Sequence, residues 1–222
     1  MMKKQWCGIG LLLVTVMLLG GCMSGRMDNV QKTGFLSDYS QLREGGEDRA
    51  ALVYIKPGVN FKPYNKLMFE RVVVMVSNNA EYRAIDPAIY KELTDYYQNA
   101  LFEAVKDGYE IVDRPGPGVL RVRAAITDVK PSKPVANTLS SITPPGIAAS
   151  LAVKLATDDN LGTGEAASEF EVLDAMTGER LAAAVDRRQG GKMVFRGKWS
   201  DTKEAFDLWA QRFRQRLDEA RK

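Results

Sequence analysis

The chain has 222 residues, of which 45% are hydrophobic and 27% are charged, with a formal net charge of +3 and no histidine. The missing histidine excludes Ser-His and Cys-His catalysis, histidine metal sites and a histidine pH switch. Two lysines and no acidic residue lie in the leader described next, so the net charge of the remaining chain is +1. A net charge this close to zero does not favour binding to nucleic acid.

The N-terminus has the three parts of a secretory signal. Lys3 and Lys4 precede an uncharged apolar run at 6–19, and small residues ending at Gly21 precede Cys22. A positive start, an apolar middle and a small-residue cleavage site predict a signal peptide cut between Gly21 and Cys22. A cysteine at this place resembles the lipobox of bacterial lipoproteins.

The lipobox resemblance implies that residues 1–21 are removed and that Cys22 carries a thioether-linked diacylglycerol and an acylated amine. Burial contributes about 0.8 kcal/mol per methylene, so two or more chains give stable membrane attachment. An aspartate after the cysteine resembles an inner-membrane retention signal in enteric lipoproteins, whereas this chain has Met23. We therefore expect a lipid anchor in the outer membrane, on the periplasmic side. An uncleaved transmembrane helix over 5–25 is the alternative, which the glycines at 8, 10, 20 and 21 disfavour.

Composition divides the rest of the chain into a tether and one domain. Residues 22–50 are mostly polar and predict a lipidated tether, and 51–222 are long enough for a single domain. Cys7 leaves with the leader, so no disulfide supports that domain. The aromatic segment 34–40 breaks the polar pattern. It is either a docking peptide for a partner or a segment held on its own domain, and we favour the second interpretation.

The first half of the domain predicts a strand, a helix and two further strands. The apolar run at 67–76 predicts a strand covered on both faces. Asp86 and Pro87 are an N-cap and a first helical residue, and a helical apolar pattern follows until Gly108, expected as a left-handed C′ residue. Strands are expected at 109–113 and at 119–129.

A long interval at 131–164 contains four prolines and the apolar run 147–156. Such a connection inside a compact domain is usually functional or disordered. Its apolar part predicts a short covering helix, and the alternative is a contact in an oligomer or at a membrane surface.

The second half predicts a hairpin and a terminal helix. Strands at 165–175 and 180–188 flank a turn with Gly178 at a positive φ, and an edge strand is possible at 192–195. Asp201 and Glu204 have capping-box spacing. The following helix is expected to bury Phe206, Trp209, Phe213 and Leu217. Its arginines at 212, 214, 216 and 221 are expected to form a solvated face, and a face that reads anionic lipid is the alternative.

These elements predict an α+β fold, in which a mainly antiparallel sheet has two amphipathic helices packed on one face. The other face would be partly open to water. Arg121 and Arg123 share one face of their strand, and so do Glu169 and Glu171. If the two strands are neighbours, the four residues form a cross-strand charge ladder. A structural ladder is the first interpretation, a polar ligand-binding face the second, and acid–base catalysis by the two glutamates the third.

No cofactor or metal site is predicted. Asp158, Asn160 and Glu169 have the spacing of a calcium loop, but position six is Thr163 where glycine is required.

Several segments together resemble a known family. In chain order they are the lipobox, GFLSDYS at 34–40, RPGPGVL at 114–120, AAITD at 124–128, DA-x-TGE at 174–179, and Trp199 with Trp209 and Ala210. Their order resembles that of proteobacterial lipoproteins of the domain-of-unknown-function 3313 family. The resemblance covers nearly the whole mature chain and implies a single domain at the envelope, with no catalytic residues to carry over.

The sequence therefore favours a non-enzymatic module of the cell envelope that binds a protein, lipid or glycan. One alternative is a hydrolase that acts on envelope polymers through acidic residues. Another is a ring or pore in which copies of the chain assemble through 140–157.

Overall fold

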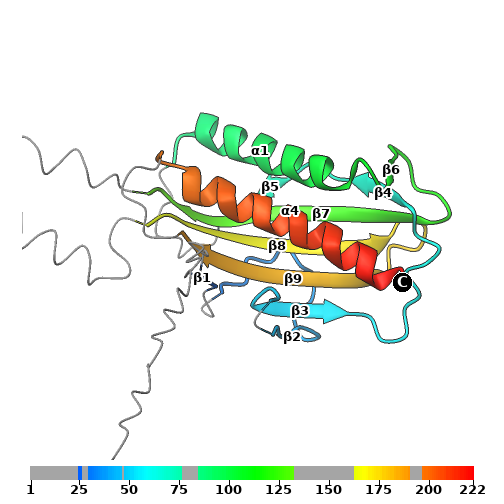
Figure 1. Ribbon diagram of the computed structural model, residues 1–222. Coiled ribbons are helices and arrows are strands. Elements are labelled where there is room, and N and C mark those ends of the chain that lie inside the picture. Colours follow the sequence, from blue (N-terminus) through cyan, green and yellow to red (C-terminus); the bar gives the residue numbers. More distant parts are fainter. Residues whose placement is uncertain (1–24, 27–29, 47, 77–84, 133–162, 191–196) are drawn as a thin grey trace, which may run out of the picture.

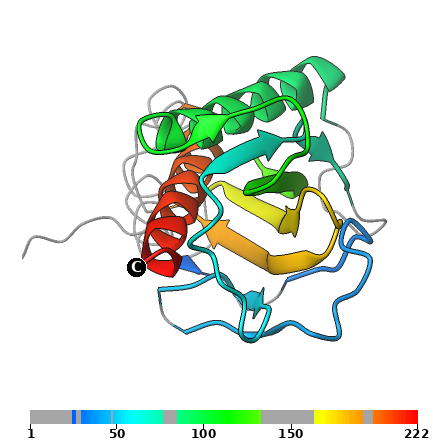
Figure 2. The same ribbon diagram turned by 90° about the vertical axis from the view of Figure 1, so that its right-hand side faces the viewer.

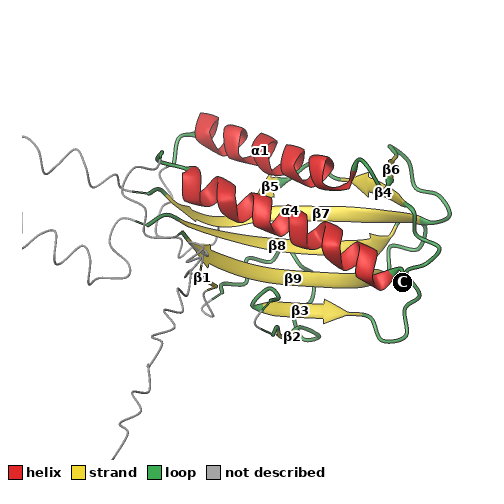
Figure 3. Ribbon diagram, in the orientation of Figure 1, coloured by secondary structure: helices red, strands yellow, loops and turns green. Residues whose placement is uncertain are grey.

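The computed structural model describes residues 25–26, 30–46, 48–76, 85–132, 163–190 and 197–222. Within these residues the chain forms one nine-stranded sheet and two helices. Helices α1 (Pro87–Val105) and α4 (Ser200–Ala220) lie side by side on one face of the sheet (Figures 1 and 3). The predicted α+β class and the placing of both helices on one face are confirmed.

The strands differ greatly in length. They are β1 (Gly25–Arg26), β2 (Arg43–Glu44), β3 (Leu52–Ile55), β4 (Lys66–Phe69), β5 (Val73–Val74), β6 (Glu110–Ile111), β7 (Val119–Lys130), β8 (Glu165–Asp174) and β9 (Arg180–Gln189). The order across the sheet is β2-β3-β9-β8-β7-β4-β6, with β1 on β9 and β5 on β7. The three long strands thus form the centre.

The sheet is mainly antiparallel, as the sequence predicted, but it also contains parallel pairs. Strands β4 and β5 pair with β7 in parallel, and β6 pairs with β4 in parallel. Parallel neighbours need a long crossover, and α1 provides it between β5 and β7. The remaining described pairs are antiparallel.

The expected strand at 67–76 is divided into β4 and β5. Phe69 lies opposite Val122 and Val73 lies opposite Ala125. The chain thus advances four residues from Phe69 to Val73 while β7 advances only three. The extra residue breaks the ladder, and the free Val72 N–H donates to the Gln98 side chain of α1 at 2.9 Å. An apolar run by itself does not reveal such a bulge.

The core lies between the central strands and the two helices. Leu120, Val122, Ala124 and Ile126 of β7 alternate toward the helices, and all four are buried. Tyr97 of α1 stacks on Phe206 of α4, with ring centroids 4.6 Å apart.

The helix ends show one confirmed prediction and two corrections. Asp86 caps α1 by accepting from the Ala88 N–H at 2.8 Å, as expected. Gly108 is not a left-handed C′ residue, because α1 ends through Lys106 in a right-handed conformation. Asp201 does not form a capping box, because its carboxylate instead accepts from Ser132 Oγ and the Gly164 N–H, both at 2.7 Å.

The hairpin of β8 and β9 is confirmed. Gly178 has a φ of 71° in its turn, where a left-handed conformation favours glycine. Asp174 at the end of β8 accepts from the backbone N–H of Met176 and of Thr177. The turn is therefore held by the acid that precedes it.

The sheet face opposite the helices is partly covered by residues 30–42, which we call the strap. Figure 2 shows this blue segment on the far side of the central strands from α1 and α4. Leu36 is 1% exposed and packs with Leu42, Ala183 and Val185. The cover is incomplete, because the side chains of Arg121 and Arg123 on β7 remain 41% and 29% exposed, so the expectation of a face partly open to water is confirmed.

Several predictions lie outside the described residues: the signal peptide at 1–21, the lipidation site Cys22, most of the interval at 131–164 and the edge strand at 192–195. In the part of the chain that the structure describes, neither helix is long and apolar enough to cross a membrane.

Candidate functional site

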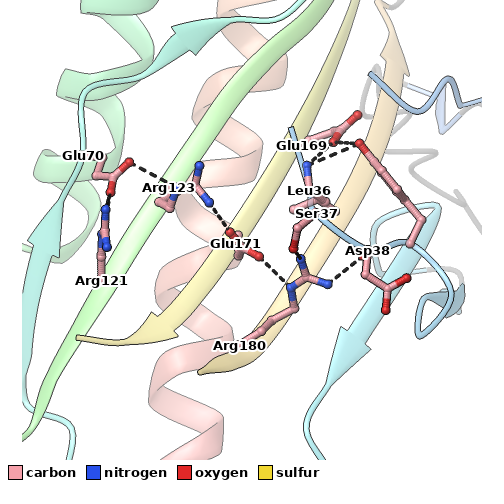
Figure 4. Close-up of polar contacts among 10 residues, drawn as sticks. Leu36, Ser37, Asp38, Glu70, Arg121, Arg123, Glu169, Glu171 and Arg180 are labelled. Atoms are coloured by element: carbon pink, nitrogen blue, oxygen red, sulfur yellow. Dashed lines mark hydrogen bonds and ion pairs between the residues drawn. The ribbon is translucent and has the colours of Figure 1, made fainter. Parts of the chain in front are cut away.

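The structure brings three of the four predicted site residues into one charge network. Arg123 lies opposite Glu171 in the register of β7 and β8, and its Nη1 donates to Glu171 Oε2 at 2.5 Å (Figure 4). Arg121 and Arg123 also pair with Glu70, which directly follows β4. The other oxygen of Glu171 accepts from Arg180 Nε at 2.6 Å. The predicted ladder therefore exists, but it includes Glu70 and Arg180, which the sequence did not single out.

Glu169 is not a rung of that ladder, contrary to the prediction. It lies opposite Ala125, is fully buried, and accepts its hydrogen bonds from the strap. The donors are the Thr33 N–H at 2.8 Å, Thr33 Oγ1 at 2.9 Å, the Leu36 N–H at 3.3 Å and the Tyr39 hydroxyl at 2.5 Å. Burial and the hydrogen bond to Glu169 raise the pKa of Tyr39. Glu169 thus holds the strap on the sheet.

Further contacts join the strap to the charge network. Arg180 donates to the carbonyl oxygen of Asp38 at 2.6 Å and to Ser37 Oγ at 3.1 Å. The guanidinium of Arg123 lies 4.8 Å from the ring centre of Phe35, a cation–π distance. The interpretation of 34–40 as a segment held on its own domain is confirmed. The described part of the interval assigned to the tether thus packs on the domain.

This polar face has the features of a structural interface. The carboxylates of Glu169 and Glu171 accept from donors within the chain, so the face presents two saturated acids. A pair of carboxylates with divided acid and base roles would need different environments and access to a substrate. Glu169 and Glu171 are both almost completely buried. We therefore place the candidate site elsewhere.

A pocket of about 190 Å³ lies on the helix face of the sheet, between α4, β9 and β3. Ala182 and Ala184 of β9 point to this side and are only partly covered, because α4 packs mainly over β8 and the small alanines leave space. Its apolar walls are formed by Val53, Ile55, Phe61, Phe170, Val172, Ala182, Ala184, Trp209, Phe213 and Leu217. Concave, mostly apolar pockets with a few polar groups are the usual form of a ligand site.

One acid of the pocket is fully used by neighbouring donors. Asp186 accepts from the Ala51 N–H at 3.0 Å, from Arg188 Nε at 2.9 Å and from Trp209 Nε1 at 2.8 Å. These bonds fix the Trp209 ring in the wall of the pocket. Asp186 therefore has a positioning role here.

The guanidinium of Arg212 differs from this acid, because its buried Nη1 has no hydrogen-bond partner among the described residues. Burial and the nearby charge of Arg188 lower the pKa of Arg212. Arg216, also in the lining, donates to Glu219 at 2.6 Å and to the carbonyl oxygen of Asp48. The pocket thus combines apolar walls with one incompletely paired cation.

The sequence assigned Arg212 to a solvated helix face, and that expectation was wrong. Arg212 lies three residues after Trp209 and next to Phe213, both on the buried stripe of α4. Residues at this spacing are neighbours on a helix. That spacing was the available signal, but the pocket depends on β3 and β9, whose distance from α4 no local pattern reveals.

No metal site competes with the pocket in the described residues. Nowhere in these segments do three histidine, cysteine, aspartate or glutamate side chains gather closely enough to hold an ion.

Comparison with protein families gives one decisive match. The family described as "Protein of unknown function (DUF3313)" matches residues 31–213. The chain belongs to the DUF3313 family. This confirms the family predicted from the sequence, and the match includes the strap, the central strands and most of α4. A search of curated proteins gave no match for this DUF3313 chain.

Solved structures similar to this DUF3313 chain have low sequence identity. The PelC dodecamer from Paraburkholderia phytofirmans is 11% identical, covers 72% of this chain and 94% of its own, and has a TM-score of 0.40. A DUF330 protein from Xanthomonas campestris is 12% identical, with 74% and 93% covered and a TM-score of 0.36. A DUF4136 protein from Bacteroides thetaiotaomicron is 8% identical, with 76% and 95% covered and a TM-score of 0.32. No residue role is carried over from them.

Proposed function

We propose that this protein is a non-enzymatic binding module of the cell envelope, anchored through acyl chains on Cys22 to the periplasmic side of the outer membrane. Its binding site is the pocket between α4, β9 and β3. The observation that carries the proposal is this apolar cavity with the incompletely paired Arg212 at its wall. The buried, saturated carboxylates of Glu169 and Glu171 support binding over the hydrolase alternative.

Strand β1 supports the anchored arrangement. Gly25 pairs with Gln189 of β9 three residues after Cys22, and an extended chain spans at most about 3.5 Å per residue. An acylated Cys22 would therefore lie within about 11 Å of the domain. Such a short connection raises the effective concentration of the pocket toward membrane components, so a weak contact would be occupied.

Replacement of the anchor residue tests the location. We expect Cys22→Ser to leave the protein either in the soluble fraction or as an unprocessed precursor, because no acyl chain can be attached. Metabolic labelling with a fatty acid, followed by membrane fractionation, measures this. A Cys7→Ser variant is the matched control and should stay labelled and membrane-bound. Lipid label that persists in Cys22→Ser would contradict the proposed anchor.

Labelling with a neutral alkyl probe tests the pocket. We expect a photoreactive dodecanol, added to membranes that carry the full protein, to modify peptides of β9 and α4. Ala184→Leu should reduce this labelling several-fold, because it fills the cavity. Ala88→Leu, at an exposed position of α1, makes the same change away from the pocket and should leave the labelling unchanged. Even labelling over the whole surface, insensitive to Ala184→Leu, would refute the pocket as the binding site.

A further inference from the structure

We propose that the pocket receives the aliphatic chain of a single-chain anionic amphiphile, whose charged head group pairs with Arg212. This inference rests on the proposed function and deepens it by naming the class of ligand. The shared chemistry is one alkyl chain with a carboxylate or phosphate at its end.

The walls of the pocket favour an aliphatic chain. Most of the lining side chains are hydrocarbon or aromatic, and burial of each methylene against such walls contributes about 0.8 kcal/mol. A volume of about 190 Å³ slightly exceeds the roughly 150 Å³ of an engineered apolar cavity that binds benzene. The pocket therefore has room for part of one chain, and Ile55 at its rim, 51% exposed, leaves a path for the remainder.

The charges of the pocket favour an anionic head group. Asp186 already accepts three hydrogen bonds, so it offers no free acid for a cationic ligand. Arg212 has a nitrogen without a partner, and the positive charges of Arg188 and Arg216 lie nearby together with the negative charges of Asp186 and Asp48, so the group as a whole keeps one net positive charge. A carboxylate or phosphate beside the Arg212 guanidinium would add charge-assisted hydrogen bonds, which are about twice as strong as neutral ones.

The position of Arg212 joins the two halves of this argument. Trp209 and Phe213, its neighbours on α4, are wall residues, so an anion at Arg212 would lie at the edge of the apolar surface. An uncharged chain would use the walls alone, and a cation would meet repulsion from Arg212. The arrangement therefore distinguishes ligands of equal length by the sign of the head group.

Three photoreactive probes with the same dodecyl chain test the inference: a carboxylate, an alcohol and a trimethylammonium. They are added to the full protein in zwitterionic bilayers, and labelling of β9 and α4 is expressed relative to labelling of the rest of the chain. We expect the carboxylate to label the pocket at least about fivefold more than the trimethylammonium, consistent with about 1 kcal/mol of preference. Labelling of the pocket by the alcohol should be intermediate between that by the other two probes.

Two charge variants provide the matched comparison. Arg212→Gln should bring the three probes to nearly equal labelling, whereas Arg212→Lys should keep a preference for the carboxylate. Arg114→Gln removes one positive charge from a side chain that is 87% exposed and does not line the pocket, and it should leave the preference unchanged. Circular dichroism of each variant establishes that the fold is retained.

The outcomes separate this inference from the proposed function. Equal pocket labelling by all three probes in the unaltered protein would overturn the head-group inference and leave the pocket as an apolar binding site. Loss of all labelling in Arg212→Gln would indicate that Arg212 only forms part of the pocket wall, and this result would also overturn the head-group inference. Labelling of the pocket by none of the probes, or only after a bound protein is removed, would refute both the ligand class and a pocket for small amphiphiles.

Discussion

The two faces of the central sheet differ in how completely their buried polar groups are paired. On the strap face, buried acids such as Glu169 and Glu171 have every oxygen paired with donors from the chain. On the helix face, an apolar core surrounds Tyr97 and Phe206, yet an adjacent pocket keeps open space and an incompletely paired Arg212. Saturated polar groups stabilise a fold, whereas an unsatisfied one beside a cavity indicates a place for a ligand.

The comparison predicts different responses to mutation. Changes on the strap face and in the helix-face core should destabilise the protein, because they remove completed interactions. Replacement of Arg212 in the pocket should be neutral or stabilising in the absence of ligand. Four variants test this, from the largest expected effect to the smallest.

Phe206→Ala should give the largest loss, about 3–5 kcal/mol in the free energy of unfolding. Phe206 is fully buried and stacks on Tyr97, so truncation leaves a cavity in the best-packed part of the core. Urea denaturation measures the loss. Met176→Ala, in an exposed turn, is the control and should change the value by less than about 0.5 kcal/mol. A small loss at Phe206 would place the core elsewhere.

Glu169→Ala should lower the unfolding free energy by about 2–4 kcal/mol, because hydrogen bonds to a charged acceptor are lost together. The same change should release the strap. Hydrogen exchange at the Thr33 and Leu36 amides, which donate to Glu169, should become faster, while exchange in α1 stays slow. Glu169→Gln keeps one acceptor oxygen and replaces the other by an amide group that donates, so it should lose only part of these hydrogen bonds and have a smaller effect. Unchanged protection of both amides would show that the strap is held by its apolar contacts alone.

Glu165→Gln should reveal a pH-dependent contribution of about 1–2 kcal/mol on the strap face. Burial raises the pKa of Glu165, but hydrogen bonds from Arg187 and Lys130 outweigh it, so the folded pKa lies below the ordinary 4.5. The carboxylate therefore stabilises the fold fully above pH 4.5, and this contribution is lost as the pH falls through the folded pKa.

Urea denaturation of the Glu165→Gln variant and the unaltered protein at several pH values measures this contribution. The difference between them should be greatest at pH 7 and should narrow below pH 4.5. A difference that is constant with pH would mean that the charge of Glu165 contributes nothing.

Arg212→Met should have the smallest effect and the opposite sign, a gain of about 1 kcal/mol without ligand. The substitution places an apolar side chain against the pocket and removes a buried nitrogen that lacks a hydrogen-bond partner. Thermal unfolding of the two proteins measures the gain. Arg214→Met is the matched control on α4 and should destabilise, because Arg214 is paired with Asp218 at 2.7 Å. A clear loss of stability in Arg212→Met would show that Arg212 is already satisfied.

Local patterns predicted the parts of this fold that depend on near neighbours. Asp86 with Pro87 marked the start of α1, Gly178 marked the hairpin turn, and alternation placed Arg121 and Arg123 on one face of β7. The predictions failed where a distant group decided the outcome. Asp201 had the spacing of a capping box, but Ser132 and Gly164 bind its carboxylate.

The site residues expected from the sequence also divide into those set by near neighbours and those set by distant groups. Glu171 and Arg123 were expected to meet, because direct cross-strand neighbours follow from register. Glu169 was assigned to the same ladder, since the sequence cannot show that Thr33 and Tyr39 compete for its oxygens from 130 and more residues away. Arg212 was placed in solvent for a similar reason.

The amino-acid sequence by itself determined the family, the two helices, the central hairpin and which residues share a strand face, because propensity and periodicity act over a few residues. Only the tertiary structure decided that the strap covers part of one face, that parallel strands join the sheet and that a pocket remains beside Arg212. These features depend on which segments meet across the sheet. Their free energies come from burial and hydrogen bonds between groups far apart in the chain, which no local pattern contains.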